Sequence, residues 1–308
     1  MTHARARAGV PGAQFLDPKV LARIDNLELL ARTVVDGFLN GLHRAPYLGL
    51  SMDFAEHRPY VPGDDTRHLD WRLFARSDRH YVKQYEAETN ANVMALIDVS
   101  ASMSYRSDPE GVTKLDYARY LTACLLHFSR GQRDRVGLAT FDDDIRDYVP
   151  TSARNLDRAL HVLARAEAGR AGDLYPALLK AAERVGRRGI VVVISDFYEP
   201  VDRAMEALRL LRGRGHDLVV FRVMDPAELA LPFEDPTNFE DLETGEQMPV
   251  IPKKLKEGYD ALVDGHVREL EERCTAERMD HVLLDASKPL DMALFRYLTI
   301  REKKARVR

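Results

Sequence analysis

Between Asn90 and Pro226, short apolar segments alternate with longer segments whose apolar residues recur at helical spacing. This alternation constrains the fold most, because a sheet made of nearly continuous apolar strands must be covered by helices on both faces. The predicted strands are 93–99, 136–141, 145–149, 190–195 and 218–223. The predicted helices are 113–130, 155–166, 174–187 and 201–214. The pattern indicates an α/β domain with a mostly parallel sheet.

A run of three aspartates, Asp142, Asp143 and Asp144, separates two of these strands. A connection this short joins strands that run in opposite directions, as in a β-hairpin. One strand at the edge of the sheet should therefore be antiparallel to the others.

The segments on either side of this domain have a different character. Asp17 and Pro18 predict the start of a helix that runs through Phe38 and ends at Gly41. The next residues are irregular, polar and aromatic, with a helical piece near 71–75 and a strand at 81–85. The chain thus divides into a flexible N-terminus at 1–16, an N-terminal helix and irregular β module at 17–88, and the α/β domain at 89–226.

The fourth part, residues 227–308, is expected to be a connector followed by C-terminal helices packed on the α/β domain. A hairpin at 239–247 that turns at Thr244 and Gly245 should come first. The segments after it read as a helix at 252–279, a strand at 281–284 and a final helix at 289–303.

Oxygen-bearing side chains follow two of the predicted strands. Asp98, Ser100 and Ser102 alternate after the first strand of the domain, and Asp196 directly follows the strand at 190–195. Ligand sites of open α/β sheets gather at the carboxyl ends of strands, so these residues should lie together. Carboxylates and hydroxyls suit a hard cation such as Mg²⁺. A metal site and an ordinary set of helix caps and turn residues are both compatible with this pattern.

This arrangement resembles the metal-ion-dependent adhesion site of von Willebrand factor A domains. The resemblance implies that Asp98, Ser100, Ser102 and Asp196 surround a Mg²⁺ ion together with a threonine from a middle loop. It also implies that an acidic side chain of a partner protein fills the open position on the metal.

The middle loop departs from the family. The sequence Ala171-Gly172-Asp173-Leu174 stands where the family usually has Gly-Thr-Asp-Leu, so Gly172 replaces the threonine hydroxyl. Water can take the place of one neutral ligand, and Asp173 is a candidate to compensate. At the start of a helix, however, the commoner role of an aspartate is to cap the helix.

The N-terminal module carries a second motif of spaced polar residues. It runs from Arg58 and Tyr60 to a core of Gly63, Asp64, Asp65, Arg67, Asp70, Trp71 and Arg76, followed by Lys83, Glu86 and Glu88. Together with the A-type domain, over about residues 37–225, this pattern is similar to the bacterial domain of unknown function 58 family. Because members are associated with MoxR-type AAA+ ATPases, the resemblance implies such a partner and a role in maturation or chaperone-like regulation of a client protein.

Two interpretations of this motif follow from its residue types. Its opposite charges can form an internal network that docks the module on the sheet. Alternatively, Trp71 and the arginines can form a surface that binds a partner protein, since these residue types are favoured at interfaces.

Composition argues against several other classes of protein. With 45 basic and 49 acidic residues, the net charge is −4, which gives no general attraction for nucleic acid or an anionic membrane. The longest aliphatic run, 190–194, is far shorter than the roughly 20 residues that span a bilayer. The first 14 residues show no signal-peptide pattern, and the two cysteines, Cys124 and Cys274, are expected to be reduced structural thiols. We therefore expect a cytoplasmic protein with no membrane insertion.

The sequence also lacks phosphate-binding loops, zinc-protease helices and nucleophile elbows. A non-catalytic adaptor that holds a client or an AAA+ ring is the expected function. The alternative is a metal-dependent hydrolase in which Asp98 and Asp196 hold a catalytic ion.

Overall fold

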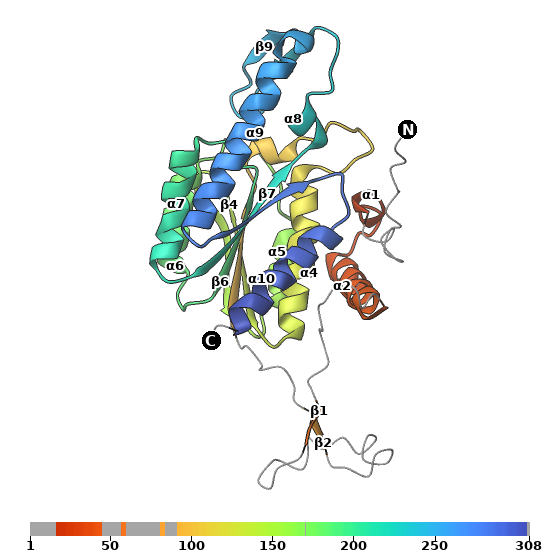
Figure 1. Ribbon diagram of the computed structural model, residues 1–308, viewed down its shortest axis with the longest axis vertical. Helices are drawn as coiled ribbons and strands as arrows, with labels where there is room; N and C mark the ends of the chain where they lie inside the picture. Colours follow the sequence, from red (N-terminus) through yellow and green to blue (C-terminus); the bar gives the residue numbers. More distant parts are fainter. Residues whose placement is uncertain (1–16, 45–56, 60–80, 84–90, 170, 307–308) are drawn as a thin grey trace.

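A computed structural model describes residues 17–44, 57–59, 81–83, 91–169 and 171–306. At its centre lies a six-stranded sheet with the order β10-β7-β6-β3-β4-β5 (Figure 1). The strands are β3 (Asn92–Asp98), β4 (Arg135–Phe141), β5 (Ile145–Ser152), β6 (Ile190–Ser195), β7 (Asp217–Met224) and β10 (Asp280–Asp285). Neighbouring strands run parallel except β5, which pairs antiparallel with β4 at one edge. The predicted sheet with one reversed edge strand is confirmed.

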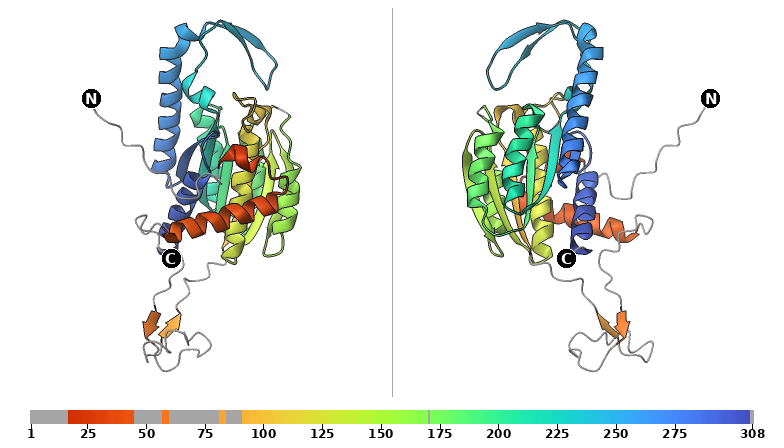
Figure 2. Two further views of the ribbon diagram at one scale, coloured as in Figure 1. Left: turned by 90° about the vertical axis from the view of Figure 1, so that its right-hand side faces the viewer. Right: turned by 60° about the vertical axis from the view of Figure 1, so that its left-hand side comes forward.

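Helices cover both faces of this sheet, as the apolar strands predicted (Figures 1 and 2). One face carries α2 (Leu27–Arg44), α4 (Lys114–Gly131), α5 (Leu156–Ala164) and α10 (Asp291–Arg306). The other carries α6 (Leu174–Arg184), α7 (Val201–Gly213) and α9 (Pro252–Ala276). Successive residues of β3 alternate between the two cores, with Ala95 and Ile97 on the α4 side and Met94 and Leu96 on the α6 side. This is the period of two that a strand buried on both faces requires.

The N-terminal helix differs from its prediction, because it is divided into α1 (Pro18–Leu21) and α2. Asp17 caps α1 as expected, its carboxylate accepting from the backbone N–H of Lys19. Asn26 then accepts hydrogen bonds from the backbone N–H groups of Glu28 and Leu29, at 2.9 and 3.0 Å, and so starts a second helix. The predicted end at Gly41 is also wrong, since one glycine costs a helix only about 1 kcal/mol and α2 continues to Arg44.

Little of the irregular β module falls within the described residues. The strands β1 (His57–Pro59) and β2 (Tyr81–Lys83) form an antiparallel ribbon, which confirms the strand predicted at 81–85 over its first three residues. The helical piece at 71–75 and the charged motif lie outside the described residues. The motif residues concerned are Gly63, Asp64, Asp65, Arg67, Asp70, Trp71 and Arg76.

The C-terminal segment contributes directly to the sheet. After β7 come α8 (Pro226–Ala230) and the predicted hairpin, formed by β8 (Thr237–Glu240) and β9 (Gln247–Val250). Helix α9 carries this hairpin beyond the sheet edge (Figure 2), and β10 returns to pair with β7. The segment assigned to a connector and packed helices therefore supplies a strand of the α/β domain. No helix in the described part of the chain has the length and apolar character needed to span a membrane.

Candidate functional site

The carboxyl ends of β3 and β6 bring the predicted acids and hydroxyls together. The strands are parallel neighbours, with Ile97 of β3 opposite Ile194 of β6, so Asp98 and Asp196 emerge at the same edge. We call Asp98, Ser100, Ser102 and Asp196 the acid–hydroxyl cluster. Asp98, Ser100 and Asp196 are buried, and all four residues line one cavity.

Hydrogen bonds fix the first loop of this cluster. The backbone N–H of Ser100 donates to Oδ1 of Asp98 at 2.8 Å, and the hydroxyl of Ser195 donates to Oδ2 at 2.6 Å. The Ser100 and Ser102 hydroxyl oxygens are 3.0 Å apart. A short 3₁₀ helix, η4 (Ala101–Ser104), begins after Ser100 and turns the loop back over the end of β3. The loop therefore presents both hydroxyls beside a carboxylate that already accepts two hydrogen bonds.

The two carboxylates of the cluster repel one another. Burial and the neighbouring charge of Asp196 raise the pKa of Asp98 to about 7, and the hydrogen bonds from Ser195 and Ser100 oppose this rise only in part. A buried pair of acids favours either a proton or a nearby positive charge. A cation near these two carboxylates would therefore be stabilised electrostatically.

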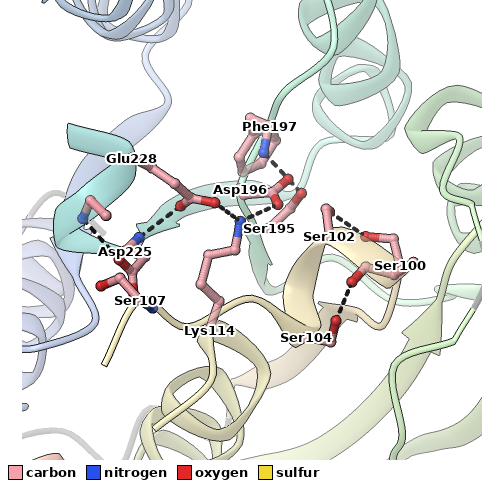
Figure 3. A network of polar contacts seen from close by, with 12 residues as sticks. Ser100, Ser102, Ser104, Ser107, Lys114, Ser195, Asp196, Phe197, Asp225 and Glu228 are labelled. Atoms are coloured by element: carbon pink, nitrogen blue, oxygen red, sulfur yellow. Dashed lines mark hydrogen bonds and ion pairs between the residues drawn. The ribbon is translucent and has the colours of Figure 1, made fainter. Parts of the chain in front are cut away.

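Lys114, in the first turn of α4, supplies one such positive charge beside Asp196 (Figure 3). Its ammonium lies 2.8 Å from Oδ2 of Asp196 and 2.7 Å from Oε1 of Glu228, and its side chain is 0% exposed. Burial alone would lower the pKa of Lys114, but the two carboxylates outweigh it and the pKa is raised. The centre of the Tyr198 ring lies 4.7 Å from Nζ of Lys114. Lys114 is therefore a permanent internal counter-ion of Asp196.

The sequence analysis missed Lys114 and Glu228. A lysine in the first turn of a helix opposes the helix dipole, which signals that carboxylates lie nearby. Glu228 belongs to α8, where Asp225 and Glu228 form a capping box: Asp225 accepts from the backbone N–H of Ala227, and Glu228 accepts from that of Asp225. Asp225 also accepts from the backbone N–H of Ser107, 3.0 Å away, which ties α8 to the loop after β3.

A second buried cation, the guanidinium of Arg222, contacts the backbone of Asp196. Arg222 of β7, opposite Ser195 in the register, donates to the backbone carbonyl of Asp196 at 2.9 Å. Its guanidinium also lies 2.8 Å from Nδ1 of His266 on α9, whose Nε2 is 3.0 Å from the backbone carbonyl of Glu199. This chain of contacts attaches α9 to the loop that carries Asp196.

The middle loop also reaches the cluster, but its aspartate has other partners. Asp173 caps α6 by accepting from the backbone N–H of Tyr175 at 3.2 Å, and its second oxygen is paired with Arg203 at 2.5 Å. Gly172 packs so closely that a Cβ atom there would lie 2.8 Å from Cβ of Ser100. The backbone conformation of this loop thus leaves no room for a threonine beside Ser100.

A cavity of about 590 Å³ opens above the acid–hydroxyl cluster. The hairpin, α8 and the start of α9 form its other walls, with apolar contributions from Phe233, Phe239, Leu242 and Met248. All five residues predicted as metal ligands, Asp98, Ser100, Ser102, Asp173 and Asp196, line this cavity. It has a polar floor and a largely apolar roof, an arrangement that suits a ligand with one charged and one apolar part.

The donor atoms of the floor fit a hard divalent cation. Within the described ranges, no three His, Cys, Asp or Glu side chains gather closely enough to hold a metal ion by themselves. A cation here would therefore need the hydroxyls of Ser100 and Ser102 as well as Asp98 and Asp196. These are oxygen ligands of the kind that Mg²⁺ prefers, and Mg²⁺ keeps several waters where protein ligands are few. Lys114 pairs with Asp196 and Glu228 but not with Asp98, so a cation beside Asp98 would still find an acidic partner.

Comparison with known proteins gives matches over most of the chain. Residues 56–269 match the family described as protein of unknown function DUF58. The uncharacterized protein Mb1516 of Mycobacterium bovis is 31% identical over 257 residues, covering 80% of this chain and 79% of the relative.

Solved structures of low sequence identity are also similar. The conserved hypothetical protein BatB from Bacteroides thetaiotaomicron aligns with a TM-score of 0.47 at 20% identity, over 69% of this chain and 99% of that one. The SpRpn10 VWA domain aligns with a TM-score of 0.40 at 12% identity, over 66% of this chain and 92% of that one.

Proposed function

This chain belongs to the DUF58 family of proteins of unknown function, and we propose that it is a non-catalytic module that binds a protein partner through its acid–hydroxyl cluster. The observation that carries this proposal is the convergence of Asp98, Ser100, Ser102 and Asp196 on the floor of one cavity. The cluster combines the Asp98 carboxylate, which has no ion-pair partner among the described residues, with the hydroxyls of Ser100 and Ser102. The cavity walls outside the hairpin, including Leu231 and Leu255, add apolar surface. Protein interfaces often combine such a polar anchor with apolar contacts around it.

A divalent cation would be held by Ser100 and Ser102 together with Asp98 and Asp196. When bound, Mg²⁺ supplies a positive charge that attracts a carboxylate of the partner. The residues of the chain position the ligands: the hydrogen bonds to Asp98 orient its carboxylate, and the ion pair with Lys114 holds the Asp196 carboxylate in place. Gly172 contributes no ligand, which favours weak binding of the metal in the absence of a partner.

A MoxR-type AAA+ ATPase is the partner we propose, with a client protein that the complex matures or regulates. The proposal rests on the family resemblance carried by the N-terminal motif and the A-type domain. Such an ATPase supplies the energy, while this chain supplies the recognition surface. ATP is a cytoplasmic substrate, so we place the complex in the cytoplasm.

Calorimetric titration with Mg²⁺ and Mn²⁺, before and after addition of a MoxR-type ATPase, tests the proposal. Asp98→Ala should abolish metal binding and weaken binding of the ATPase at least about tenfold, because it removes the central carboxylate. Asp98→Asn, which keeps the shape of the side chain, should behave in the same way. Asp143→Ala is the matched control, since Asp143 lies at the same sheet edge but is 61% exposed and pairs with Arg146.

Equal ATPase affinity for the wild-type chain and both Asp98 variants would overturn the proposal. Turnover of a phosphoester or peptide that disappears in Asp98→Ala would also contradict it, and would favour the metal-dependent hydrolase instead. Circular dichroism of each variant checks that the fold is intact.

A further inference from the structure

The tip of the β8–β9 hairpin has a shape that does not depend on the rest of the molecule. The Asp241 carboxylate accepts from the backbone N–H groups of Glu243 and Thr244, at 2.8 and 3.2 Å. Two backbone hydrogen bonds close the same turn, from Gly245 to the carbonyl of Asp241 and from Asp241 to that of Glu246. Gly245 has a φ of +72°, which an L-residue rarely adopts. The turn thus presents Glu243 and Leu242 in a fixed orientation.

The hairpin bends back toward the sheet from the end of α9 (Figure 2), and its tip residues Leu242 and Glu243 line the same cavity as the acid–hydroxyl cluster. Oε1 of Glu243 lies 3.7 Å from the position that a Cβ atom on Gly172 would take. Burial raises the pKa of the Glu243 carboxyl, and hydrogen bonds from the Gly172 backbone and the Ser102 hydroxyl oppose that rise. A carboxylate from the same chain therefore lies beside Gly172 in the cavity that Ser102 also lines.

The contact is held by few interactions. In the part of the chain that the structure describes, β8 and β9 pair only with each other, and of their residues Val250 alone is buried. An edge-to-face contact between Phe233 and Phe239, 5.4 Å between ring centres, fixes the base of the hairpin. At the tip, the charge of Asp196 opposes the approach of Glu243. A contact that few groups hold and that a like charge opposes is one that a competing ligand can replace.

We propose that the hairpin tip is an internal copy of the partner's contact segment, and that the partner presents an acidic turn with an apolar residue beside its carboxylate. This inference rests on the proposed function. The partner's carboxylate takes the place of the Glu243 carboxylate beside Gly172, and its apolar residue takes the place of Leu242, which is 43% exposed. Binding then requires the hairpin to move away from the cavity, so the hairpin lowers the apparent affinity of the free chain.

A labelled cyclic peptide with the sequence of residues 239–248 is the probe, and fluorescence anisotropy with the full chain is the measurement. Glu243→Gln in the protein should bind this peptide at least about fivefold more tightly than wild type, because its own hairpin competes less well. Glu246→Gln is the matched control, since Glu246 lies in the same turn but does not line the cavity. A peptide in which the residue equivalent to Glu243 is glutamine should bind at least about fivefold more weakly.

Hydrogen exchange gives an independent readout. In Glu243→Gln, the amides of the loop around Gly172 should exchange at least about tenfold faster than in wild type and in Glu246→Gln. Equal peptide affinity and equal exchange in all three proteins would overturn the hairpin proposal. That result is distinct from failure of the proposed function, which shows as unchanged ATPase binding in Asp98→Ala whatever the hairpin does.

Discussion

At the scale of single residues, the site depends on how its buried charges are matched. Lys114 has no exposed surface and bridges two carboxylates from different segments, the loop after β6 and helix α8. Removing one member of such a group leaves an uncompensated charge in a medium where solvation is poor. The two buried carboxylates therefore depend on one ammonium group for charge compensation.

Lys114→Met should lower the free energy of unfolding by about 3–5 kcal/mol, because Asp196 and Glu228 lose their shared cation. Lys180→Met is the control: its ammonium lies 2.7 Å from Asp144, but these side chains are 45% and 44% exposed, so the loss should stay below about 1 kcal/mol. Urea unfolding followed by circular dichroism measures both. Losses of similar size in the two variants would contradict this account of Lys114.

At the scale of elements, the six strands of the central sheet were predicted to within three residues of their observed ends, and the helices of the α/β domain to within about the same margin, whereas β1 was not predicted. The strands are nearly all apolar and the helices alternate with them, so local pattern and burial agree. The N-terminal helix was not predicted correctly, because a side chain at Asn26 decides where α2 begins. The apolar residues keep their helical spacing across this break, so the spacing alone does not reveal that a capping residue divides the helix.

Asn26→Ala should therefore cost about 1 kcal/mol of stability, since two backbone N–H groups at the start of α2 lose their acceptor. Asn155→Ala is the comparison, because Asn155 also precedes a helix but makes no side-chain capping hydrogen bond there; its amide donates instead to the Pro150 carbonyl in an exposed contact. Its effect should be less than half as large. Thermal unfolding monitored by circular dichroism distinguishes the two, and equal losses would show that Asn26 is not the cap.

At the scale of the whole molecule, the site is assembled from distant parts of the sequence. The sequence predicted Asp98, Ser100, Ser102 and Asp196, because each follows a strand whose position the apolar pattern defines. It did not predict Glu228, His266 or Glu243, which reach the same place from α8, α9 and the hairpin. No local pattern predicts that approach, since it depends on how the C-terminal segment folds back over the sheet edge.

The same segment is part of the core. Tyr297 of α10 is fully buried, and its hydroxyl is 3.0 Å from that of Ser129 on α4. Tyr297→Ala should cost about 3–5 kcal/mol although it lies far beyond 226, the boundary that the sequence suggested. Met292→Ala on the same helix should cost less than about 0.5 kcal/mol, because Met292 is 60% exposed. A small effect of Tyr297→Ala in urea unfolding would mean that α10 is peripheral.

The missing side chain at residue 172 has a consequence for how this family diversifies. A Cβ atom on Gly172 would lie 2.8 Å from Cβ of Ser100 and 3.7 Å from Oε1 of Glu243, so a threonine there would have to shift the loop and would then crowd the Glu243 carboxylate. Positions 172 and 243 should thus co-vary among relatives: chains that keep glycine should keep an acid at the hairpin tip, and chains with threonine should lose it. The residues at positions 172 and 243, 71 residues apart, would then indicate whether a relative has an internal carboxylate in the cavity or a cavity open to its partner.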